Sequence, residues 1–595
     1  MGANHHRGCR AWRSKRGSIA VSVLAIIVVV LELCTVTLLM TSSGIQRVTR
    51  EESRIACLHL AEAGIQEVAG QIWNSFKVSQ SFDQIDSQSV PFNTITRNLG
   101  SQQCYQASVT TVNNVDSYTR DLVIVSVGWT DTDGDVVLDT DEPRRAIRAL
   151  VRFSLSRSAI FDYAYFVNNY GWMNGFSSTQ LIVNGDMRAN GNFDFSGGTP
   201  TINGSVYAAP NSRLIPPAEG VVNITPNQWT NTYYETNASS RARQAYNSTK
   251  HGDIGSDQFK QWCDIIYSHD ASIVNENVFG AVVGDKNGIK TYGGTVLDPE
   301  PMHTLPMPDL SDISRYQTLS NNYVDTKATF ADGTPNPNYN QGAYLEVWDS
   351  GTGSYQRIST NGVVTGSAVV IGTFEHPVKV HGPVTVTQDV IIKGNIQGQG
   401  TIYAGRNVHI VGSIIYQDPP DFRGSDPEAI DNANEKKSIL GLAASASIIM
   451  GDTSTFGKYP LQYMTPPFTK PRYDDNGNYI PAFDANAIDS YGVKKYRSLL
   501  GDAYIHSVAS PISQIDAVLY TNFLGGGNIG TGGGGVTFNG SIISKDEAMV
   551  LYSLPFRMNY DNRIKERSLG GKPLIDINLP RTPSVVQLNW QEILT

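Results

Sequence analysis

One short acidic segment carries the residue types that bind a hard metal ion. Residues 131–142 hold five aspartates around Gly134: Asp131, Asp133, Asp135, Asp139 and Asp141. Carboxylates around a tight glycine turn are ligands that Ca²⁺ favours. The spacing is not that of an EF-hand, because Trp129 occupies the first ligand position if Gly134 is the loop glycine. Two interpretations stay open: a calcium site that neutralises mutually repelling carboxylates, or a solvated turn in which an Asp-Gly pair reverses the chain.

Residues 378–415 are the second place where chemistry is conceivable. A glycan-cleaving site needs two or three carboxylates on one face. Asp389 is the only acid in this stretch, and Asn407 takes the equivalent position one period later. His376, His381 and His409 have no acid at an evident spacing to orient them. The sequence has no nucleophile-elbow or zinc-protease motif, so we expect no enzyme activity, and glycan cleavage is the remaining catalytic alternative.

Composition narrows the class of protein further. The chain has 595 residues, too many for one core, and a formal net charge of −9, which disfavours nucleic-acid binding. Cys9, Cys34 and Cys57 precede the expected exported head, which leaves Cys104 and Cys263 within it. These two form a disulfide or remain buried thiols, and no Cys/His spacing indicates zinc. We expect no cofactor other than the calcium just considered.

The start of the chain combines a basic tail with a long apolar run. The tail carries five basic residues and no acid: Arg7, Arg10, Arg13, Lys15 and Arg16. An apolar run follows from Ser18 to Met40. At a rise of about 1.5 Å per residue, a helix of this length crosses the roughly 30 Å hydrocarbon core. The charge asymmetry places the N-terminus in the cytoplasm and the residues after Met40 outside the membrane.

A helical pattern continues beyond the membrane run to about Phe76. Its apolar residues recur at steps of three and four: Ile55, Leu58, Ala61, Ile65, Val68, Ile72 and Phe76. Glu32 is the only charged residue within the membrane run. A carboxylate at that depth is costly, so Glu32 is either neutral and tolerated or paired inside an assembly of helices.

The N-terminal region resembles that of type IV pilin-like proteins. Basic residues, Gly17 and an intact apolar helix resemble a leader that a prepilin peptidase trims between Gly17 and Ser18. Ala61, Glu62, Ala63 and Gly64 are similar to the "AEAG" segment of PilX-type minor pilins, where small residues permit close helix packing. The resemblance implies a retained helix that associates with other pilin-like subunits. Ser22 departs from it, because pilins usually carry Glu as the fifth mature residue, and an uncleaved signal anchor is the alternative.

The region after the helix has the alternation of β-strands. Apolar residues alternate at 104–112, 122–128 and 146–153, which predicts an antiparallel meander packed on the helix. From residue 159 the chain becomes rich in Gly, Asn, Ser and Thr. A pattern of apolar, any, Gly, small polar and apolar residues recurs at 183–187, 202–206, 392–396, 410–414 and 538–542. The first two copies are about 20 residues apart, and so are the copies at 392–396 and 410–414. This period predicts a β-helix or solenoid with glycine at its corners.

Two long insertions and a C-terminal segment complete the expected domain order. That order is a basic leader at 1–17, the helix at 18–76, a small β module at 77–158, solenoid-like segments at 159–215 and 363–416, an irregular insertion at 216–362, a Pro-rich insertion at 417–505, and a C-terminal β segment and cap at 506–595. Residues 559–563 and 588–592 resemble the closing stretches of large bacterial PilX-like envelope proteins. Trp590 is expected to plug the last coil.

These observations favour assembly or adhesion over catalysis. We expect a non-enzymatic minor pilin or pseudopilin in the bacterial inner membrane, with its mainly β head outside. Such a subunit can also be incorporated into a surface filament. Its expected partners are the membrane, prepilin peptidase, other pilin-like subunits and a surface or glycan ligand. The alternative is a membrane-anchored β-helix protein that binds or cleaves carbohydrate.

Overall fold

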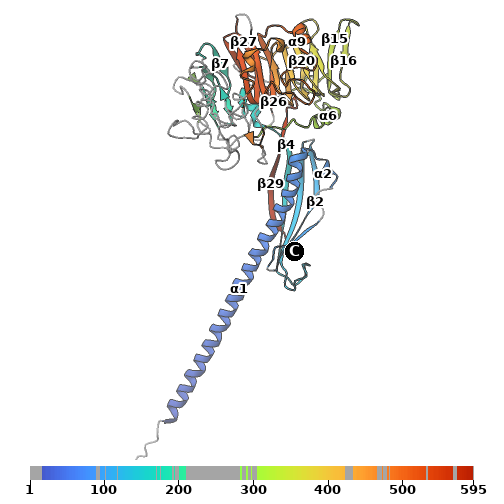
Figure 1. The fold of residues 1–595 in the computed structure, drawn as a ribbon. Helices are drawn as coiled ribbons and strands as arrows, with labels where there is room; N and C mark the ends of the chain where they lie inside the picture. Colours follow the sequence, from blue (N-terminus) through green and yellow to red (C-terminus); the bar gives the residue numbers. More distant parts are fainter. Residues whose placement is uncertain are drawn as a thin grey trace, which may run out of the picture. The chain divides into compact units, whose positions relative to one another are not determined.

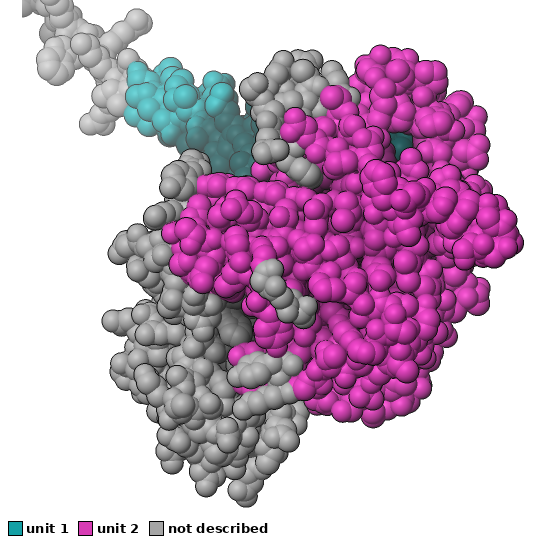
Figure 2. Space-filling view, turned by 90° about the horizontal axis from the view of Figure 1, so that it is seen from above, with its two compact units in different colours: residues 1–155, 583–595 teal, residues 156–582 magenta. Residues whose placement is uncertain are grey.

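The computed structural model divides the chain into two compact units (Figures 1 and 2). Unit 1 comprises Met1–Leu155 and Pro583–Thr595, and unit 2 comprises Ser156–Thr582. The described residues are 16–88, 94–100, 102–116, 118–168, 171–173, 176–190, 193–194, 200–208, 282–283, 290–291, 296–297, 305–421, 433–465, 469, 472–473, 479–480, 483–530, 534–566 and 573–593.

Unit 1 is built on one continuous helix, α1 (Arg16–Ser79), of 64 residues (Figure 1). Its sequence contains no proline, so every backbone amide beyond the first turn can donate within the helix. Residues 20–52 are exposed throughout, and burial begins at Cys57. The expected single helix from the apolar run to about Phe76 is confirmed, and it ends at Ser79.

A five-stranded antiparallel sheet packs on the second half of α1. Its strands lie in the order β1 (Ile95–Asn98), β2 (Gln103–Asp116), β3 (Thr119–Thr130), β4 (Arg144–Arg157) and β29 (Arg581–Ile593). The core between helix and sheet contains the predicted helix stripe from Ala61 to Phe76, with Leu58 partly buried against it, and alternate sheet residues such as Ile124 and Val151. The first residue of the predicted stripe, Ile55, is 54% exposed and does not belong to this core. The predicted meander on the helix is therefore confirmed. A short helix, α2 (Asp83–Asp86), adds Phe82 and Ile85 to this core.

The fifth strand of unit 1 follows the whole of unit 2 in the sequence. In Figure 1, β29, in dark red, lies beside the blue and cyan elements of unit 1. Arg145 of β4 forms an ion pair with Glu592, and the hydroxyls of Ser154 and Ser584 lie 2.7 Å apart. Unit 2 is thus inserted between β4 and β29. The expected plug at Trp590 is wrong, because this side chain lies on β29 in unit 1 and is 47% exposed.

Unit 2 is mainly β, most of its strand pairs are parallel, and it contains a small parallel barrel. The largest sheet has 19 strands. Its parallel members are β5 (Tyr165–Val167), β7 (Leu181–Asn184), β8 (Met187–Ala189), β10 (Thr201–Asn203), β11 (Val206–Ala208), β13 (Lys290–Thr291), β14 (Val296–Leu297), β17 (Val363–Val364), β18 (Ala368–Ile371), β19 (Val378–Val386), β20 (Val390–Ala404), β21 (Val408–Tyr416), β22 (Ile439–Ala444), β23 (Ile448–Met450), β26 (Gln514–Ile529), β27 (Val536–Leu551) and β28 (Phe556–Tyr560). An antiparallel hairpin, β15 (Tyr344–Asp349) and β16 (Ser354–Arg357), joins β19.

Smaller elements complete unit 2. A three-stranded sheet contains β6 (Gly171–Trp172), β9 (Phe193–Asp194) and β12 (Val282–Val283), and a two-stranded sheet contains β24 (Arg472–Tyr473) and β25 (Tyr479–Ile480). Within the described residues of unit 2, the helices are α6 (Ile313–Asn322), α8 (Lys458–Leu461) and α9 (Asp502–Val508), with 3-10 turns η1 (Ala159–Asp162), η5 (Thr453–Thr455) and η6 (Asn562–Ile564).

Parallel partners recur at the spacing that the sequence predicts. Val390 pairs with Val408, and Ile182 pairs with Thr201, in each case one period further along the chain. The glycines of the repeat sit where strands approach closely. At Gly540, whose φ is +142°, a Cβ would lie 1.9 Å from the carbonyl oxygen of Ala517. No other residue fits there, since both the backbone conformation and the space require glycine.

The last strands of unit 2 pair with its first strands. Phe538 of β27 pairs with Met558 of β28, Met558 with Val183 of β7, and Val183 with Ile202 of β10. All four side chains are buried in one core. The repeats at 183–187, 202–206 and 538–542 therefore belong to one continuous run of parallel strands, although they come from opposite ends of unit 2 in the sequence.

Side-chain amides follow this run of strands. Asn203 donates to Asn184, Asn184 to Asn559, Asn559 to Asn539, and Asn539 to Asp516, over 2.6–2.8 Å. Each of the inner members donates one hydrogen bond and accepts another. We call these five residues the amide ladder. It joins the first and last strands of unit 2 through a polar row beside the apolar core.

The predicted insertions have different outcomes. Most of 216–362, including Cys263, lies outside the described residues. The apolar strands expected inside 417–505 are β22 and β23, which join the parallel sheet through β20 and β21. Among the other described residues of this insertion, Phe456, Tyr496 and Ile505 contribute to two small apolar clusters outside the main core.

Candidate functional site

The first part of α1 is the feature with the clearest functional meaning. Within the described residues, one helix is long and apolar enough to cross a membrane, and it is α1. The apolar window is not covered by any other described part of the chain, unlike the core helix of a soluble protein. Glu32 is exposed within it. Gly17 and Ser18, the predicted processing residues, belong to the first turn of this helix.

The "AEAG" segment lies at the point where α1 meets its own sheet. Ala61 and Gly64 are buried there, whereas Glu62 and Ala63 are partly exposed. A Cβ on Gly64 would lie 2.2 Å from the hydroxyl of Ser126, and one on Gly128 would lie 2.2 Å from the carbonyl oxygen of Cys57. The small residues therefore serve close helix–sheet packing within the subunit. Their buried surfaces are not available to a neighbouring helix.

The predicted acidic loop forms two groups of closely spaced carboxylates. One contains Asp131, Asp133 and Glu142, and the other contains Asp133, Asp135 and Asp139. In each group one oxygen per residue lies within 4.8 Å of the others. This donor set suits a hard cation such as Ca²⁺. Asp141 lies outside both groups, and Glu142 is a member that sequence reasoning missed, although its position in the same acidic run was the available signal.

Backbone amides hold the acidic loop in shape. Asp131 is fully buried and accepts hydrogen bonds from the amides of Gly134 and Val136 at 2.7 and 3.0 Å. Although burial acts in the opposite direction, these amides lower the pKa of Asp131. The amide of Asp135 acts to lower the pKa of Asp133, but desolvation and the charges of Asp135 and Asp131 outweigh it and raise that pKa. The raised pKa of Asp133 reflects the repulsion that a cation would relieve.

Of the two cysteines considered for a disulfide, the structure describes Cys104 and not Cys263. Cys104 is fully buried in unit 1, as is Cys57. Burial raises the pKa of both thiols. Cys263 lies outside the described residues, so the disulfide stays a prediction.

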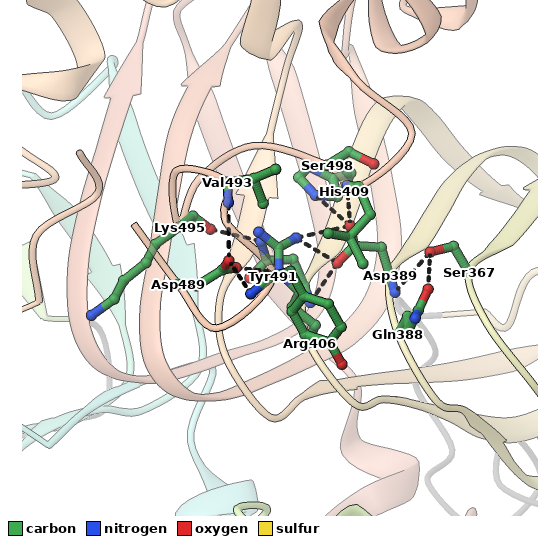
Figure 3. A network of polar contacts seen from close by, with 12 residues as sticks. Ser367, Gln388, Asp389, Arg406, His409, Asp489, Tyr491, Val493, Lys495 and Ser498 are labelled. Atoms are coloured by element: carbon green, nitrogen blue, oxygen red, sulfur yellow. Dashed lines mark hydrogen bonds and ion pairs between the residues drawn. The ribbon is translucent and has the colours of Figure 1, made fainter. Parts of the chain in front are cut away.

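Asp389 belongs to a buried ion-pair network (Figure 3). Arg406 donates to both of its carboxylate oxygens at 2.8 Å and to Asp489 at 2.7 Å. The amides of Asn407 and Leu499 also donate to Asp389. Asp389 has no exposed surface. Through Asp489 and Leu499, the network connects the 489–499 loop to the parallel strands. Asn407 lies next to Asp389 one period later in the sequence, as predicted, because its backbone amide donates to that carboxylate at 3.1 Å.

The three histidines of this region are spread apart. His409 is fully buried, 3.9 Å from Asp389, and neither ring nitrogen has a hydrogen-bond partner among the described residues. Burial lowers its pKa to about 4, although Asp389 acts to raise it. Burial also lowers the pKa of His381, whose Nε2 lies 3.5 Å from Asp325. His376 stacks on Trp348 with ring centroids 3.8 Å apart. The histidines therefore do not converge on one site.

Comparisons with known proteins give a distant likeness to a pilin. No protein-family profile matches the chain, and no curated protein matches it in sequence. Among solved structures, the competence-associated pilin ComZ from Thermus thermophilus matches with 11% identity, over 91% of this chain and 98% of that chain. The TM-score is 0.25, which does not establish a common fold.

Proposed function

We propose that the chain is a pilin-like envelope subunit that assembles into, or adheres through, a type IV pilus or a related secretion filament. The carrying observation is α1, whose first part is apolar and uncovered while its second part packs on an antiparallel sheet. A helix of this kind can remain in the inner membrane or dock laterally among similar helices, with its folded part outside. Assembly, not catalysis, is the role this arrangement supports.

The orientation and processing follow from the same helix. The basic tail stays in the cytoplasm, a prepilin peptidase cuts between Gly17 and Ser18, and the apolar helix is kept. Glu32 is exposed on α1 and is a candidate for pairing inside a helix assembly.

The head supplies adhesion in this proposal. We interpret the parallel strands, whose partners lie one period apart, as successive coils of a solenoid that presents its insertions to a surface or glycan ligand. A head of this size would obstruct regular packing along a filament shaft, so the filament tip is the proposed position. Evenly spaced label along filaments from cells with a tagged copy would contradict the tip position.

N-terminal sequencing tests the proposal most directly. Co-expression with a prepilin peptidase should yield a mature chain that begins at Ser18, and Gly17→Val should block the cut. The variant Gly44→Val, far from the cleavage point and with open space around its Cβ position, is the control and should be processed normally. A chain that keeps its leader through Gly17 would instead indicate a static signal-anchored protein.

A membrane-anchored carbohydrate-binding or carbohydrate-cleaving protein is the alternative. The burial of Asp389 in an ion pair with Arg406 disfavours cleavage, because a general acid must reach the substrate. Release of reducing ends from acidic polysaccharides, abolished by Asp389→Ala, would support that alternative.

A further inference from the structure

An antiparallel edge of unit 2 presents one face outside the main core. The hairpin β15–β16 joins β19, and Figure 1 shows both of its strands at one edge of unit 2. On one side of the hairpin and β19, Leu345 and Val380 are buried in the main core. On the other side lie aromatic and charged side chains that are partly or fully exposed: Tyr344, Glu346, Trp348, Tyr355, Arg357 and Lys379. We call these six residues the hairpin face.

An aromatic row crosses one end of the hairpin face. Trp348 and Tyr355 are directly opposite each other in the hairpin, with ring centroids 5.3 Å apart. His376, from the turn before β19, stacks on Trp348 with its ring nearly parallel. Phe374, in the same turn, is 71% exposed. Aromatic rings gathered at a surface offer the flat apolar area on which the C–H groups of a sugar ring can stack.

A charged row lies next to the aromatic row. Glu346 is directly opposite Arg357 on one side and Lys379 on the other. Nε and Nη2 of Arg357 donate to Oε1 of Glu346 at 3.1 and 2.8 Å, whereas Oε2 accepts no hydrogen bond from any described residue. Nζ of Lys379 lies 3.8 Å from the ring centroid of Tyr355 and has no carboxylate partner among the described residues. The row therefore keeps one acceptor and one donor that can bind hydroxyl groups.

Tyr344 lies on the other side of the charged row. The guanidinium of Arg357 is 4.4 Å from the ring centroid of Tyr344. Tyr344 and Trp348 are four residues apart on β15, which corresponds to about 13 Å along a strand. Rings separated by this length, with a polar row between them, suit a short chain of sugar units better than a single sugar.

We infer that the hairpin face binds a glycan. The C–H groups of the sugar rings stack on the aromatic row, and their hydroxyl groups bind Lys379 and Glu346. A protein partner fits less well, because the face has no aliphatic side chain and a stable protein interface takes about 20–30 residues from each side. A nucleic acid also fits less well, since two cations beside one carboxylate are not the clustered positive charge that phosphates require.

The inference concerns the part of the head to which the proposed function assigns adhesion. β15 and β16 belong to the predicted insertion at 216–362, which that proposal presents to a surface or glycan ligand. The inference rests on the proposed function, and it names the binding surface and the class of ligand.

A printed array of neutral, uronic-acid and sialic-acid oligosaccharides tests the inference. The labelled full chain in detergent should bind a subset of these glycans, and Trp348→Ala should reduce the signal at least tenfold. Lys379→Gln changes a partly exposed side chain outside the core, so it should keep the fold and still weaken binding by a similar factor. The matched control Tyr552→Ala removes a 50% exposed ring outside the hairpin face and should bind like the wild-type chain.

The arms of the array separate the sources of the ligand. Binding to the acidic oligosaccharides alone identifies a carboxylate as the partner of Lys379, and equal binding to neutral ones shows that hydroxyl groups suffice. An array without bound glycan, or a signal that either Trp348→Ala or Lys379→Gln leaves unchanged, would overturn the inference.

N-terminal sequencing of the same preparation, made with co-expressed prepilin peptidase, distinguishes the inference from the proposed function. A chain that begins at Ser18 but binds no glycan contradicts the inference alone. A chain that keeps its leader and binds glycan through the hairpin face contradicts filament assembly and supports the membrane-anchored carbohydrate-binding alternative.

Discussion

The side-chain amide of Asn184 on β7 donates a 2.7 Å hydrogen bond to the side-chain carbonyl of Asn559 on β28, across 375 residues of sequence. This contact is the middle of the amide ladder, where the first strands of unit 2 meet its last strands. Parallel neighbours in register bring identical amides to the spacing at which each can donate and accept. The ladder therefore holds together two segments that short-range contacts cannot connect.

Asn539→Ala should destabilise unit 2. The substitution removes the acceptor for Asn559 and the donor to Asp516, which is buried and also accepts from Gln514. Leaving buried polar groups without partners costs about 1–3 kcal/mol. Thermal unfolding of the full chain in detergent should show a lower midpoint. The control Asn322→Ala, on an exposed position of α6, should leave the midpoint unchanged, and equal midpoints for all three proteins would contradict a stabilising ladder.

Gly128→Ala should loosen the packing of α1 on its sheet. The added Cβ would lie 2.2 Å from the carbonyl oxygen of Cys57 and 2.6 Å from the amide nitrogen of Ala61, so the helix backbone must move. Overpacking of this kind costs about 1–3 kcal/mol, which limited proteolysis of unit 1 would detect as faster cleavage. Gly70→Ala is the matched control, because open space surrounds its Cβ position and alanine favours a helix. Unchanged proteolysis of the Gly128 variant would show that helix and sheet are not tightly packed.

The stability of unit 2 should fall as the pH drops from 6.5 towards 4. Burial holds the folded-state pKa of His409 at about 4, below its ordinary 6.5, with Asp389 and Arg406 acting in opposite directions. The unfolded chain binds the proton first, so this stability is fully present above the ordinary pKa and is lost on acidification, by about 3 kcal/mol in total. His409→Leu should flatten the dependence of the unfolding midpoint on pH in this window. An unflattened profile for His409→Leu would assign the dependence elsewhere.

Ca²⁺ should stabilise unit 1 through the acidic loop. A ligand at a hundred times its Kd adds about 2.7 kcal/mol to the stability of the folded state, so the unfolding midpoint of the wild-type chain should rise with Ca²⁺. The double variant Asp133→Asn with Asp135→Asn should lose this response, since it removes ligands from both carboxylate groups. Asp141→Asn is the control because it is exposed and belongs to neither group. A wild-type midpoint that does not change with Ca²⁺ would favour the solvated turn.

Local periodicity predicted the elements whose partners lie near them in sequence. The helix stripe and the three strands at 104–153 form one packed module because their apolar spacing already specifies which faces meet. The period of the glycine pattern likewise reappears as strand register at Val390 and at Ile182. In the acidic loop, the turn around Gly134 predicted a cluster of carboxylates, and the structure adds Glu142 to it.

Long-range partners could not be predicted in the same way. Ser584 contacts Ser154 across 430 residues, and nothing in the alternation of β29 distinguishes a fifth strand of the first module from a cap on the head. The amide ladder has the same origin, since Asn559 and Asn184 align only when unit 2 brings its two ends together. Asp389 and Arg406 are close in sequence, but the loop that buries them, which carries Asp489, comes much later in the chain.

The insertion of unit 2 between β4 and β29 sets an order on biogenesis. A ribosome adds β29 only after the whole of unit 2 has been made. A chain interrupted anywhere in unit 2 would still carry α1 and its first four strands, yet Leu588 and Trp590 would be missing. Only a complete chain can therefore form the five-stranded sheet of unit 1, so closure of that sheet distinguishes complete chains from interrupted ones.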